Sequence, residues 1–315
     1  MSDTVHVVTG GAGFIGSHLV RTLVDRGECV RLIDDFSSGC RENLAEIDAT
    51  AYEVFEVDIR DAKALEPAFR DATYVYHQAA VPSVPRSVDD PVTSITANVE
   101  GSLNVLLAAR DAGAAKVVYA SSSSVYGDTE ELPKHEGLRP SPLSPYAVSK
   151  ASAEMLGLIF PKLYGLETVG LRYFNVFGPR QDPNSQYAAV IPRFITRLLD
   201  GKPPIIYGDG EQTRDFTFVE NVVEANLGAA RSSASGISVN IACGDRISLN
   251  QLASRLNEIL GTKLTPEYQD TRAGDVRDSQ ADIRRAREAF GFDPAVSFDE
   301  GLCRTAAWYQ KQSAS

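Results

Sequence analysis

Tyr146 and Lys150 are the residues whose types and spacing point most directly to acid–base chemistry. They stand four positions apart, so a helix here would place the phenol and the ammonium on one face. A free tyrosine has a pKa near 10, and work as a base at neutral pH requires a lowering by about three units, or roughly 4 kcal/mol. We expect the charge of Lys150 and that of a cationic ring on a bound cofactor to supply this lowering.

A run of serines at 121–124 directly follows a predicted strand over 116–120. Ligands of parallel sheets dock beyond the carboxyl ends of the strands. A hydroxyl near the phenol can relay a proton or donate a hydrogen bond to a developing alkoxide. The serines would also suit a polar loop, and it is their position that favours the chemical interpretation.

A glycine turn near the start of the chain predicts a dinucleotide site. An apolar strand over 4–9 leads into Gly10, Gly13 and Gly16. We expect Gly10 to allow the tight turn, Gly13 to let backbone N–H groups approach a pyrophosphate, and Gly16 to let the helix pack close to the strand. The helix expected over 14–26 points its positive end at the phosphates.

An acidic residue follows the next predicted strand, 29–33, at the spacing that a dinucleotide site requires. Asp34 stands about twenty residues after the glycines, where a carboxylate can bond both ribose hydroxyls of NAD and repel the extra phosphate of NADP. Asp34 could also simply cap the strand, and Asp35 is a second candidate. The pattern predicts NAD as the cofactor.

The composition narrows the class of protein. The chain has 315 residues and a net charge of −11, which argues against a nucleic-acid partner because such partners favour basic surfaces. No apolar run approaches the roughly 20 residues needed to cross a bilayer, so no membrane partner is expected. The four scattered cysteines form no metal-binding pattern and fit a reducing cytoplasm, where we expect the protein to reside. No metal is expected.

Strand and helix patterns alternate, which is typical of a parallel sheet covered by helices. Further strands are predicted over 52–57, 73–77, 116–120, 167–172 and 239–241, and helices over 61–70, 91–112, 145–164, 190–199, 219–231, 249–260, 283–290 and 298–309. Residues 178–185 and 202–210 are predicted to be loops rich in Gly and Pro. The fold class predicted is α/β, a Rossmann-type doubly wound parallel sheet with a smaller C-terminal α/β substrate-binding domain.

The expected division into domains follows from where this alternation breaks. Residues 1–174, joined by about 216–242, form the predicted NAD-binding Rossmann domain. Residues 175–215 and 243–315 form the predicted cap. A crevice between such a sheet and its cap is a natural ligand site.

Several motifs together give the chain a family resemblance over nearly its whole length. They are the glycine turn at 9–16, Ser-Ser-Val-Tyr-Gly at 123–127, the Tyr146 and Lys150 pair, Arg-Tyr-Phe-Asn at 172–175 and Arg-Asp-Phe at 214–216. The chain resembles the extended short-chain dehydrogenase/reductases that act on nucleotide sugars, and among them most of all the UDP-sugar 4-epimerases. The resemblance implies an NAD-dependent isomerase that inverts C4 of a UDP-hexose.

The resemblance also implies residue roles. Catalysis falls to Ser122, Tyr146 and Lys150. The cofactor would be bound by Gly10, Gly13, Phe14, Ile15, Gly16, Asp34, Asp35, Asp58, Ile59, Gln78, Ala79, Ala80, Asn98, Tyr146, Lys150 and Tyr173. The UDP-sugar would be bound by Ser122, Ser123, Tyr146, Asn175, Ala189, Val190, Tyr207, Arg214, Arg277 and Ser279. His77 lines the cofactor crevice and is expected to serve packing rather than catalysis.

Other positions separate branches of the family. Sugar 4,6-dehydratases carry an Asp-Glu pair where this chain has Ser123 and Ser124, so dehydration is disfavoured, and the related decarboxylases carry a glutamate there. The small Ser279 implies room for an acetamido group. UDP-glucuronate 4-epimerisation stays open as an alternative function, in which the serines or Arg86 would bind the carboxylate of the sugar. A non-catalytic protein that binds NAD stays open as well. The helices over 91–112 and 145–164 imply a homodimer.

Overall fold

The central sheet is parallel and has seven strands in the order β11-β6-β5-β4-β1-β2-β3. This computed structural model describes residues 4–183, 189–271 and 276–313. The strands are β1 (Val5–Thr9), β2 (Cys29–Asp34), β3 (Tyr52–Glu56), β4 (Ala72–His77), β5 (Lys116–Ser122), β6 (Glu167–Tyr173) and β11 (Ile237–Ile241). The predicted parallel Rossmann-type sheet is confirmed, including the return of the late strand β11 to its edge.

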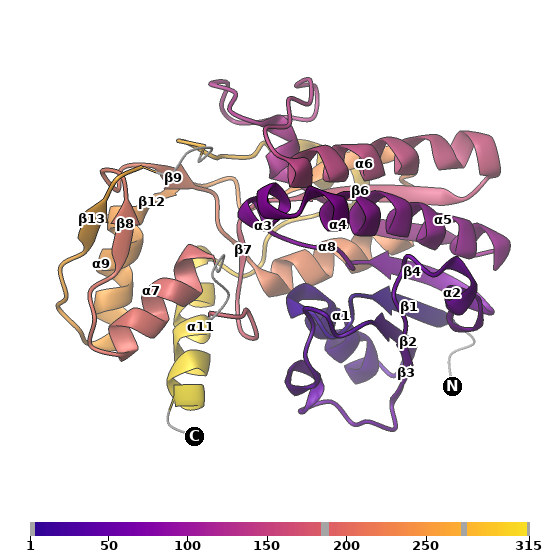
Figure 1. Cartoon of the computed structure of the whole chain (residues 1–315), viewed down its shortest axis with the longest axis horizontal. Helices are drawn as coiled ribbons and strands as arrows, with labels where there is room; N and C mark the ends of the chain where they lie inside the picture. Colours follow the sequence, from indigo (N-terminus) through magenta and orange to yellow (C-terminus); the bar gives the residue numbers. More distant parts are fainter. Residues whose placement is uncertain (1–3, 184–188, 272–275, 314–315) are drawn as a thin grey trace.

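Helices cover both faces of this sheet (Figure 1). On one face lie α2 (Ala62–Phe69), α3 (Val84–Asp89), α4 (Pro91–Ile95), α5 (Gly101–Asp111) and α6 (Pro145–Tyr164). On the other face α1 (Phe14–Asp25) packs beside α8 (Val219–Arg231). Val7 and Val8 of β1 are both fully buried but belong to different cores, because successive strand residues point to opposite faces.

The long helix α6 begins and ends at the predicted residues because both ends are capped. The Ser144 side chain accepts a hydrogen bond from the Ala147 N–H at the first turn. Gly165 takes the left-handed conformation that stops the helix. These caps set the register of Tyr146 and Lys150 on α6.

The predicted helix over 91–112 is interrupted. A π-helical turn, Thr96–Glu100, separates α4 from α5. Gly101 follows this turn and packs against Ile59. A Cβ atom at Gly101 would lie 2.6 Å from the Ile59 side chain, which would have to shift to admit it. The preceding helix α3 was not predicted; it is capped by Ser83, whose side chain accepts from the Arg86 N–H.

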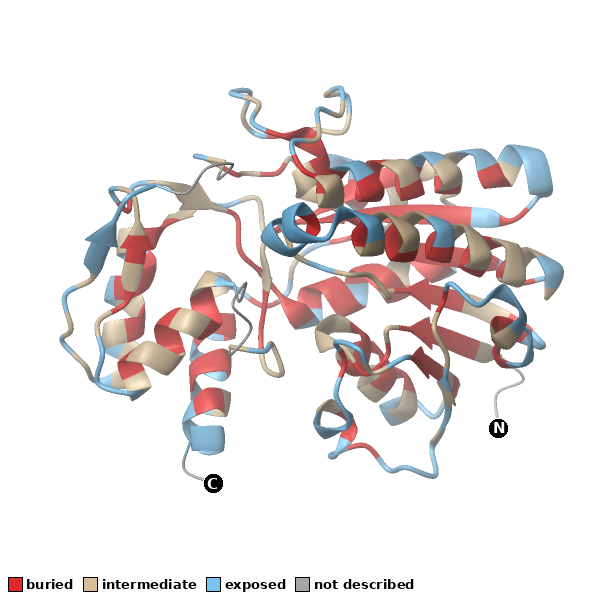
Figure 2. Cartoon of the chain, in the orientation of Figure 1, coloured by how far each residue is buried: buried red, intermediate tan, exposed pale blue. Residues whose placement is uncertain are grey.

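A smaller part of the molecule carries a second core (Figure 2). It holds α7 (Val190–Leu199), α9 (Leu249–Leu260), α11 (Phe298–Ser313), β8 (Ile205–Tyr207) and β13 (Glu267–Gln269). The prediction of a loop over 202–210 is wrong at its centre, because β8 pairs with β13 in parallel. Of the loop predicted at 178–185, residues 184 and 185 lie outside the described part.

The remaining elements are short. They are the turn Arg41–Leu44, the turn Ser123–Tyr126, α10 (Arg284–Phe290) and the strands β7 (Val176–Phe177), β9 (Thr213–Arg214), β10 (Thr217–Phe218) and β12 (Ile247–Ser248). Within the described residues, no helix has the length and apolar character to span a bilayer.

Candidate active site

The glycine turn between β1 and α1 has the close approaches that the sequence predicts. Gly10 has a φ of +67°, and a Cβ atom there would lie 2.6 Å from the Ala79 backbone nitrogen. At Gly16 a Cβ would lie 2.0 Å from the Gly10 carbonyl oxygen, so the helix packs against the turn itself more than against the strand. At Gly13 a Cβ would meet only that oxygen, at 3.1 Å, which leaves this side of the turn open to a ligand.

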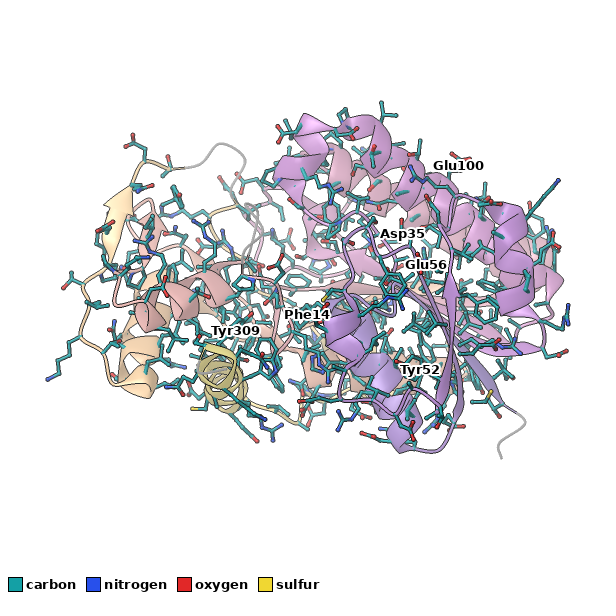
Figure 3. The ribbon with its side chains drawn as sticks, turned by 60° about the horizontal axis from the view of Figure 1, so that its bottom comes forward. Phe14, Asp35, Tyr52, Glu56, Glu100 and Tyr309 are labelled. Carbon is teal, nitrogen blue, oxygen red and sulfur yellow. The ribbon has the colours of Figure 1, made fainter. Side chains whose placement is uncertain are left out.

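The start of α1 offers donors to an anion. No side chain caps it, and Gly13 holds the cap position in an extended conformation. The first N–H groups of a helix have no partner within the helix and favour phosphate groups. Figure 3 shows Phe14 at this helix start, and its ring packs against the core of the smaller part. These residues, with Ile15, fit the pyrophosphate of a dinucleotide.

Two carboxylates lie at the end of β2, Asp34 as its last residue and Asp35 directly after it. Asp34 is buried, and its two oxygens accept from the backbone N–H groups of Ala12 and Phe36, each at 2.9 Å. Burial raises the pKa of Asp34 above its ordinary value. Asp35 is exposed and accepts from Ser37. Asp34 thus braces the glycine turn, which agrees with the capping interpretation and still leaves lone pairs for a ribose.

The predicted adenine contacts, Asp58 and Ile59, differ in exposure. The Asp58 carboxylate accepts from the Arg60 guanidinium at 2.9 Å, and this hydrogen bond lowers the pKa of Asp58. The Ile59 side chain is buried in the core beneath Gly101. Any contact of Ile59 with a base therefore falls to its backbone.

Other predicted cofactor residues hydrogen-bond one another. The Tyr173 hydroxyl donates to Gln78 Oε1 at 3.1 Å and accepts from Asn226 Nδ2 at 2.8 Å. Gln78 Nε2 in turn donates to Asn226 Oδ1 at 3.0 Å. Asn226, on α8, was missed because an asparagine inside a helix gives no motif signal. This triangle fixes the loop that carries Ala79 and Ala80.

Asn98 holds the far side of the same loop, and His77 ends the strand β4 that leads into it. Asn98 bonds both the N–H and the carbonyl of Val81, at 2.7 and 3.2 Å. His77 Nδ1 lies 2.7 Å from Thr9 Oγ1, and its Nε2 lies 2.8 Å from Ser102 Oγ. Burial lowers the pKa of His77 to about 3, so the ring is neutral, as expected for a packing residue.

The proton-transfer group, which consists of the predicted catalytic residues Ser122, Tyr146 and Lys150, comes together at the carboxyl end of β5. The strand runs to Ser122, two residues beyond its predicted end. Ser122 Oγ accepts from the N–H of Ser124 at 3.1 Å and from Ser124 Oγ at 2.9 Å. The Ser122 side chain also acts on the Tyr146 phenol, where its hydrogen-bonding contribution lowers the pKa. Because both Ser122 lone pairs are taken, its hydroxyl can act toward the phenol only as a donor.

Tyr146 and Lys150 lie on one face of α6 as predicted, with Lys150 Nζ 5.9 Å from the centre of the Tyr146 ring. Burial raises the pKa of Tyr146, while the Ser122 hydrogen bond lowers it. Without a bound cofactor, Lys150 does not contribute the expected lowering of the Tyr146 pKa. Burial lowers the pKa of Lys150 to about 8, and its ammonium donates to the Ala120 carbonyl at 3.0 Å.

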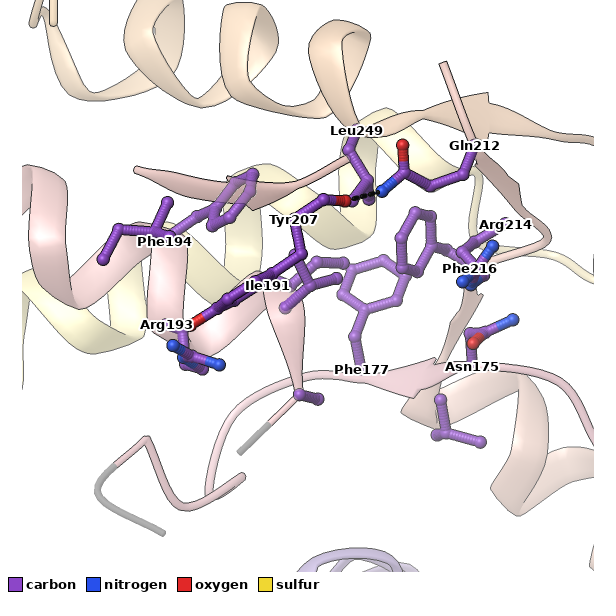
Figure 4. Close-up of a pocket in the computed structure, with 14 residues that line it drawn as sticks. Asn175, Phe177, Ile191, Arg193, Phe194, Tyr207, Gln212, Arg214, Phe216 and Leu249 are labelled. Atoms are coloured by element: carbon purple, nitrogen blue, oxygen red, sulfur yellow. Dashed lines mark hydrogen bonds between the residues drawn. The ribbon is translucent and has the colours of Figure 1, made fainter. Parts of the chain in front are cut away.

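A cavity of about 240 Å³ opens between β7, α7 and β8 (Figure 4). It is lined by Asn175, Val176, Phe177, Ala189, Val190, Ile191, Arg193, Phe194, Ile205, Tyr207, Gln212, Arg214, Phe216 and Leu249. Five of the predicted substrate residues are in this set. The volume is below the roughly 300–1,000 Å³ typical of whole drug-sized ligands, so the cavity suits one portion of a nucleotide sugar.

The other predicted substrate residues lie outside this lining. Arg277 is exposed and pairs with Asp209 at 3.2 Å. Its carbonyl accepts from Arg214 Nη1 at 3.0 Å, which brings the two predicted clamps together. Ser279 is buried and donates its N–H to the Thr213 carbonyl at 3.1 Å. Ser123, in the turn after β5, is half-buried.

Sequence reasoning missed several residues of the cavity. Arg193 adds a second cation and lies 5.9 Å from the centre of the Tyr207 ring. Gln212 Nε2 donates to the Tyr207 carbonyl, as the dashed line in Figure 4 shows. The turn signals at 208–210 pointed to a loop near Gln212 but not to the direction of its side chain.

Comparison with known proteins agrees with this arrangement. Residues 6–242 match the model of the NAD dependent epimerase/dehydratase family. A UDP-glucose 4-epimerase of Mycolicibacterium smegmatis is 39% identical over 311 residues, 98% of this chain and 99% of that protein.

Two solved structures are similar throughout. The UDP-N-acetylglucosamine 4-epimerase from Methanobrevibacter ruminantium, in complex with UDP-N-acetylmuramic acid, is 42% identical with a TM-score of 0.95, covering 99% of this chain and 100% of that one. The UDP-glucuronic acid 4-epimerase from Bacillus cereus, in complex with UDP-glucuronic acid and NAD, is 32% identical with a TM-score of 0.89, covering 98% and 100%. These relatives are isomerases, the enzyme class expected from the sequence. The chain belongs to the NAD-dependent epimerase/dehydratase family, and NAD is its cofactor.

Proposed function

We propose that this protein reversibly inverts C4 of UDP-hexoses, interconverting UDP-glucose with UDP-galactose and also their N-acetylated counterparts. The observation that carries the proposal is the grouping of Ser122, Tyr146 and Lys150 at the end of β5, where Ser122 lowers the pKa of the Tyr146 phenol and Lys150 donates to the Ala120 carbonyl. The uncapped start of α1 is suited to NAD. The relatives that epimerise UDP-glucose and UDP-N-acetylglucosamine support it.

Each residue of the group has a task in this reaction. When bound, NAD supplies reversible acceptance of the hydride from C4. Tyr146, as phenolate, takes the proton of the C4 hydroxyl, and the Ser122 O–H stabilises the negative charge on the phenol oxygen. Lys150 adds a positive charge near the ring and bonds the cofactor ribose. The 4-keto sugar turns over before the proton returns from Tyr146.

The substrate is held by its nucleotide in this proposal. The cap residues Asn175, Tyr207 and Arg214 line the cavity that receives part of UDP. Arg214 and Arg277 engage the diphosphate, since arginine forks pair with phosphate oxygens. Ser279 is small enough to leave room for an acetamido group. In this proposal the residues of the predicted Rossmann domain carry out the reaction, and those of the predicted cap bind the nucleotide.

UDP-glucuronate 4-epimerisation is the second candidate, and the similarity to the Bacillus cereus enzyme favours it. Hydroxyls of the serine segment would bond the carboxylate in that case. Dehydration is disfavoured because Ser123 and Ser124 are too weakly acidic to protonate and deprotonate carbon at neutral pH.

Proton NMR of UDP-glucose, UDP-N-acetylglucosamine and UDP-glucuronate, each incubated with protein and NAD, tests the proposal. We expect the first two to be converted to their C4 epimers. The Tyr146→Phe variant should lose at least about 10²-fold in kcat. Conversion of UDP-glucuronate alone would favour the second candidate, and a Tyr146→Phe variant as active as the wild type would refute the mechanism.

We further propose that the protein forms a homodimer through α6 and its neighbours. Apolar side chains are exposed along one side of α6, where Met155 is 60% and Leu163 is 63% exposed, while Val92 of α4 is 71% exposed. A contiguous apolar face of this kind marks an interaction surface. A second copy of the chain would cover it.

A further inference from the structure

A buried ion pair lies beneath the proton-transfer group. Glu154 stands one turn after Lys150 on α6, and Arg172 stands on β6; they are only 4% and 5% exposed. Arg172 Nε donates to Glu154 Oε2 at 3.0 Å, and Arg172 Nη2 donates to Glu154 Oε1. This two-pronged geometry fixes the orientation of both side chains.

The pair extends across the sheet through a row of polar residues. Ser121, Arg172 and Asn240 are direct neighbours on β5, β6 and β11. Ser121 Oγ donates to Glu154 Oε2 at 2.7 Å. Arg172 Nη1 donates to the Tyr126 hydroxyl at 2.8 Å, and that hydroxyl donates to Asn240 Oδ1 at 2.6 Å. The network therefore joins α6 to the end of β5 and to the turn after it.

These contacts involve immediate neighbours of the proposed catalytic residues. Ser121 precedes Ser122, and Tyr126 ends the turn that contains Ser124. Glu154 lies on the helix that carries Tyr146 and Lys150. A buried ion pair adds little net stability over apolar residues of the same volume, because both charges lose their hydration. What it does provide is one fixed arrangement of the elements that it joins.

We propose that Glu154 and Arg172 are positioning residues that set Ser122 of β5 against Tyr146 of α6 for proton transfer. The inference rests on the proposed function, because it assigns Ser122 and Tyr146 to the reaction. Displacing a reacting group by about 1 Å can cost on the order of 10²-fold in rate. Loss of the network should therefore lower kcat and leave KM for the UDP-sugar near its wild-type value, since the cavity residues are untouched.

Three variants test the role in the full-length protein with NAD. Glu154→Gln leaves Arg172 buried without its counter-charge, so it should lower both the melting temperature and kcat. The double variant Glu154→Met with Arg172→Leu removes both charges and should recover the melting temperature, while kcat stays low by on the order of 10²-fold. Ser121→Ala removes only the hydrogen bond from Ser121 to the Glu154 carboxylate and should lower kcat by about tenfold in a normally stable protein.

Glu224→Gln is the matched control, because Glu224 forms an exposed ion pair with Arg26 at 2.5 Å, and its kcat should be unchanged. Recovery of kcat together with stability in the double variant would overturn the inference. Wild-type kcat in Ser121→Ala would overturn it as well, and this variant decides if the double variant does not fold. A wild-type protein that is inactive on every UDP-sugar would instead overturn the proposed function.

Discussion

The Ser124→Ala substitution tests whether Ser122 is held as a hydrogen-bond donor to Tyr146. Ser124 gives Ser122 Oγ two hydrogen bonds, one from its N–H at 3.1 Å and one from its hydroxyl at 2.9 Å. Alanine keeps the first bond and removes the second. Ser122 then has a free lone pair, so its own hydrogen is no longer restricted to the direction of the phenol.

The magnitude follows from that single lost hydrogen bond. A bond of this kind contributes about 0.5–1.5 kcal/mol. Since about 1.4 kcal/mol in a barrier is tenfold in rate, kcat should fall between roughly 2- and 13-fold. KM and the melting temperature should stay near wild-type values. Ser124→Thr keeps the hydroxyl and is the matched control, with kcat close to wild type.

Initial rates of UDP-glucose epimerisation at saturating NAD, measured for both variants, supply the comparison. Equal kcat in Ser124→Ala and wild type would show that Ser122 needs no help from Ser124. A much larger loss, beyond about 10²-fold, would mean that Ser124 itself takes part in proton transfer, and would refute the reasoning in a different way.

Further predictions concern assembly, acid stability and the glycine turn. Met155→Glu should shift the mass in light scattering from dimer to monomer, because it places a charge in the apolar face of α6, whereas a dimer mass would contradict the proposed interface. Burial lowers the pKa of His18 to about 4, so the unfolded chain binds more protons between pH 6.5 and 4 and stability falls as pH falls through this range. His18→Gln, which can still donate to the Pro179 carbonyl, should lessen that loss by up to about 3 kcal/mol in denaturant titrations, and identical pH profiles would refute it. Gly10→Ala should abolish NAD binding in calorimetry, because alanine is strained at a φ of +67° and its Cβ would strike Ala79.

Much of the large sheet could be predicted because its signals are local. The strand β1 is rich in valine and buried on both faces, and the ends of α6 carry Ser144 and Gly165 as visible caps. β8 was hidden because its partner β13 lies some sixty residues later and strands this short carry little pattern of their own. Gly101, which follows the π-helical turn, packs against the Ile59 side chain, and this contact between distant segments leaves no local pattern in the sequence.

The residues of the candidate site also fall into those that local sequence patterns predict and those that depend on tertiary packing. Tyr146 and Lys150 could be paired from spacing alone, and the glycine turn from its motif. Asn226 and Arg193 could not, because each is an ordinary helical residue whose importance comes from where its helix packs. Spacing likewise placed Lys150 near Tyr146 but did not reveal the burial of the phenol, which raises its pKa in the chain without NAD. The lowering by Lys150 together with bound NAD stays a prediction.

The separation between anchor and chemistry bears on how specificity would arise. The cavity is lined by none of Ser122, Tyr146 and Lys150, so most binding energy is available from a nucleotide that does not react. Binding that is equal in the ground and transition states lowers KM without raising kcat. Sugars that differ only beyond the diphosphate should therefore share similar KM values and differ in kcat, because they differ in how well C4 reaches the phenol in both orientations. The sugar ring must turn over between two orientations, so the site cannot hold it tightly in either orientation. Tight contacts to the sugar would slow this rotation, which is the step that distinguishes an epimerase from a simple dehydrogenase.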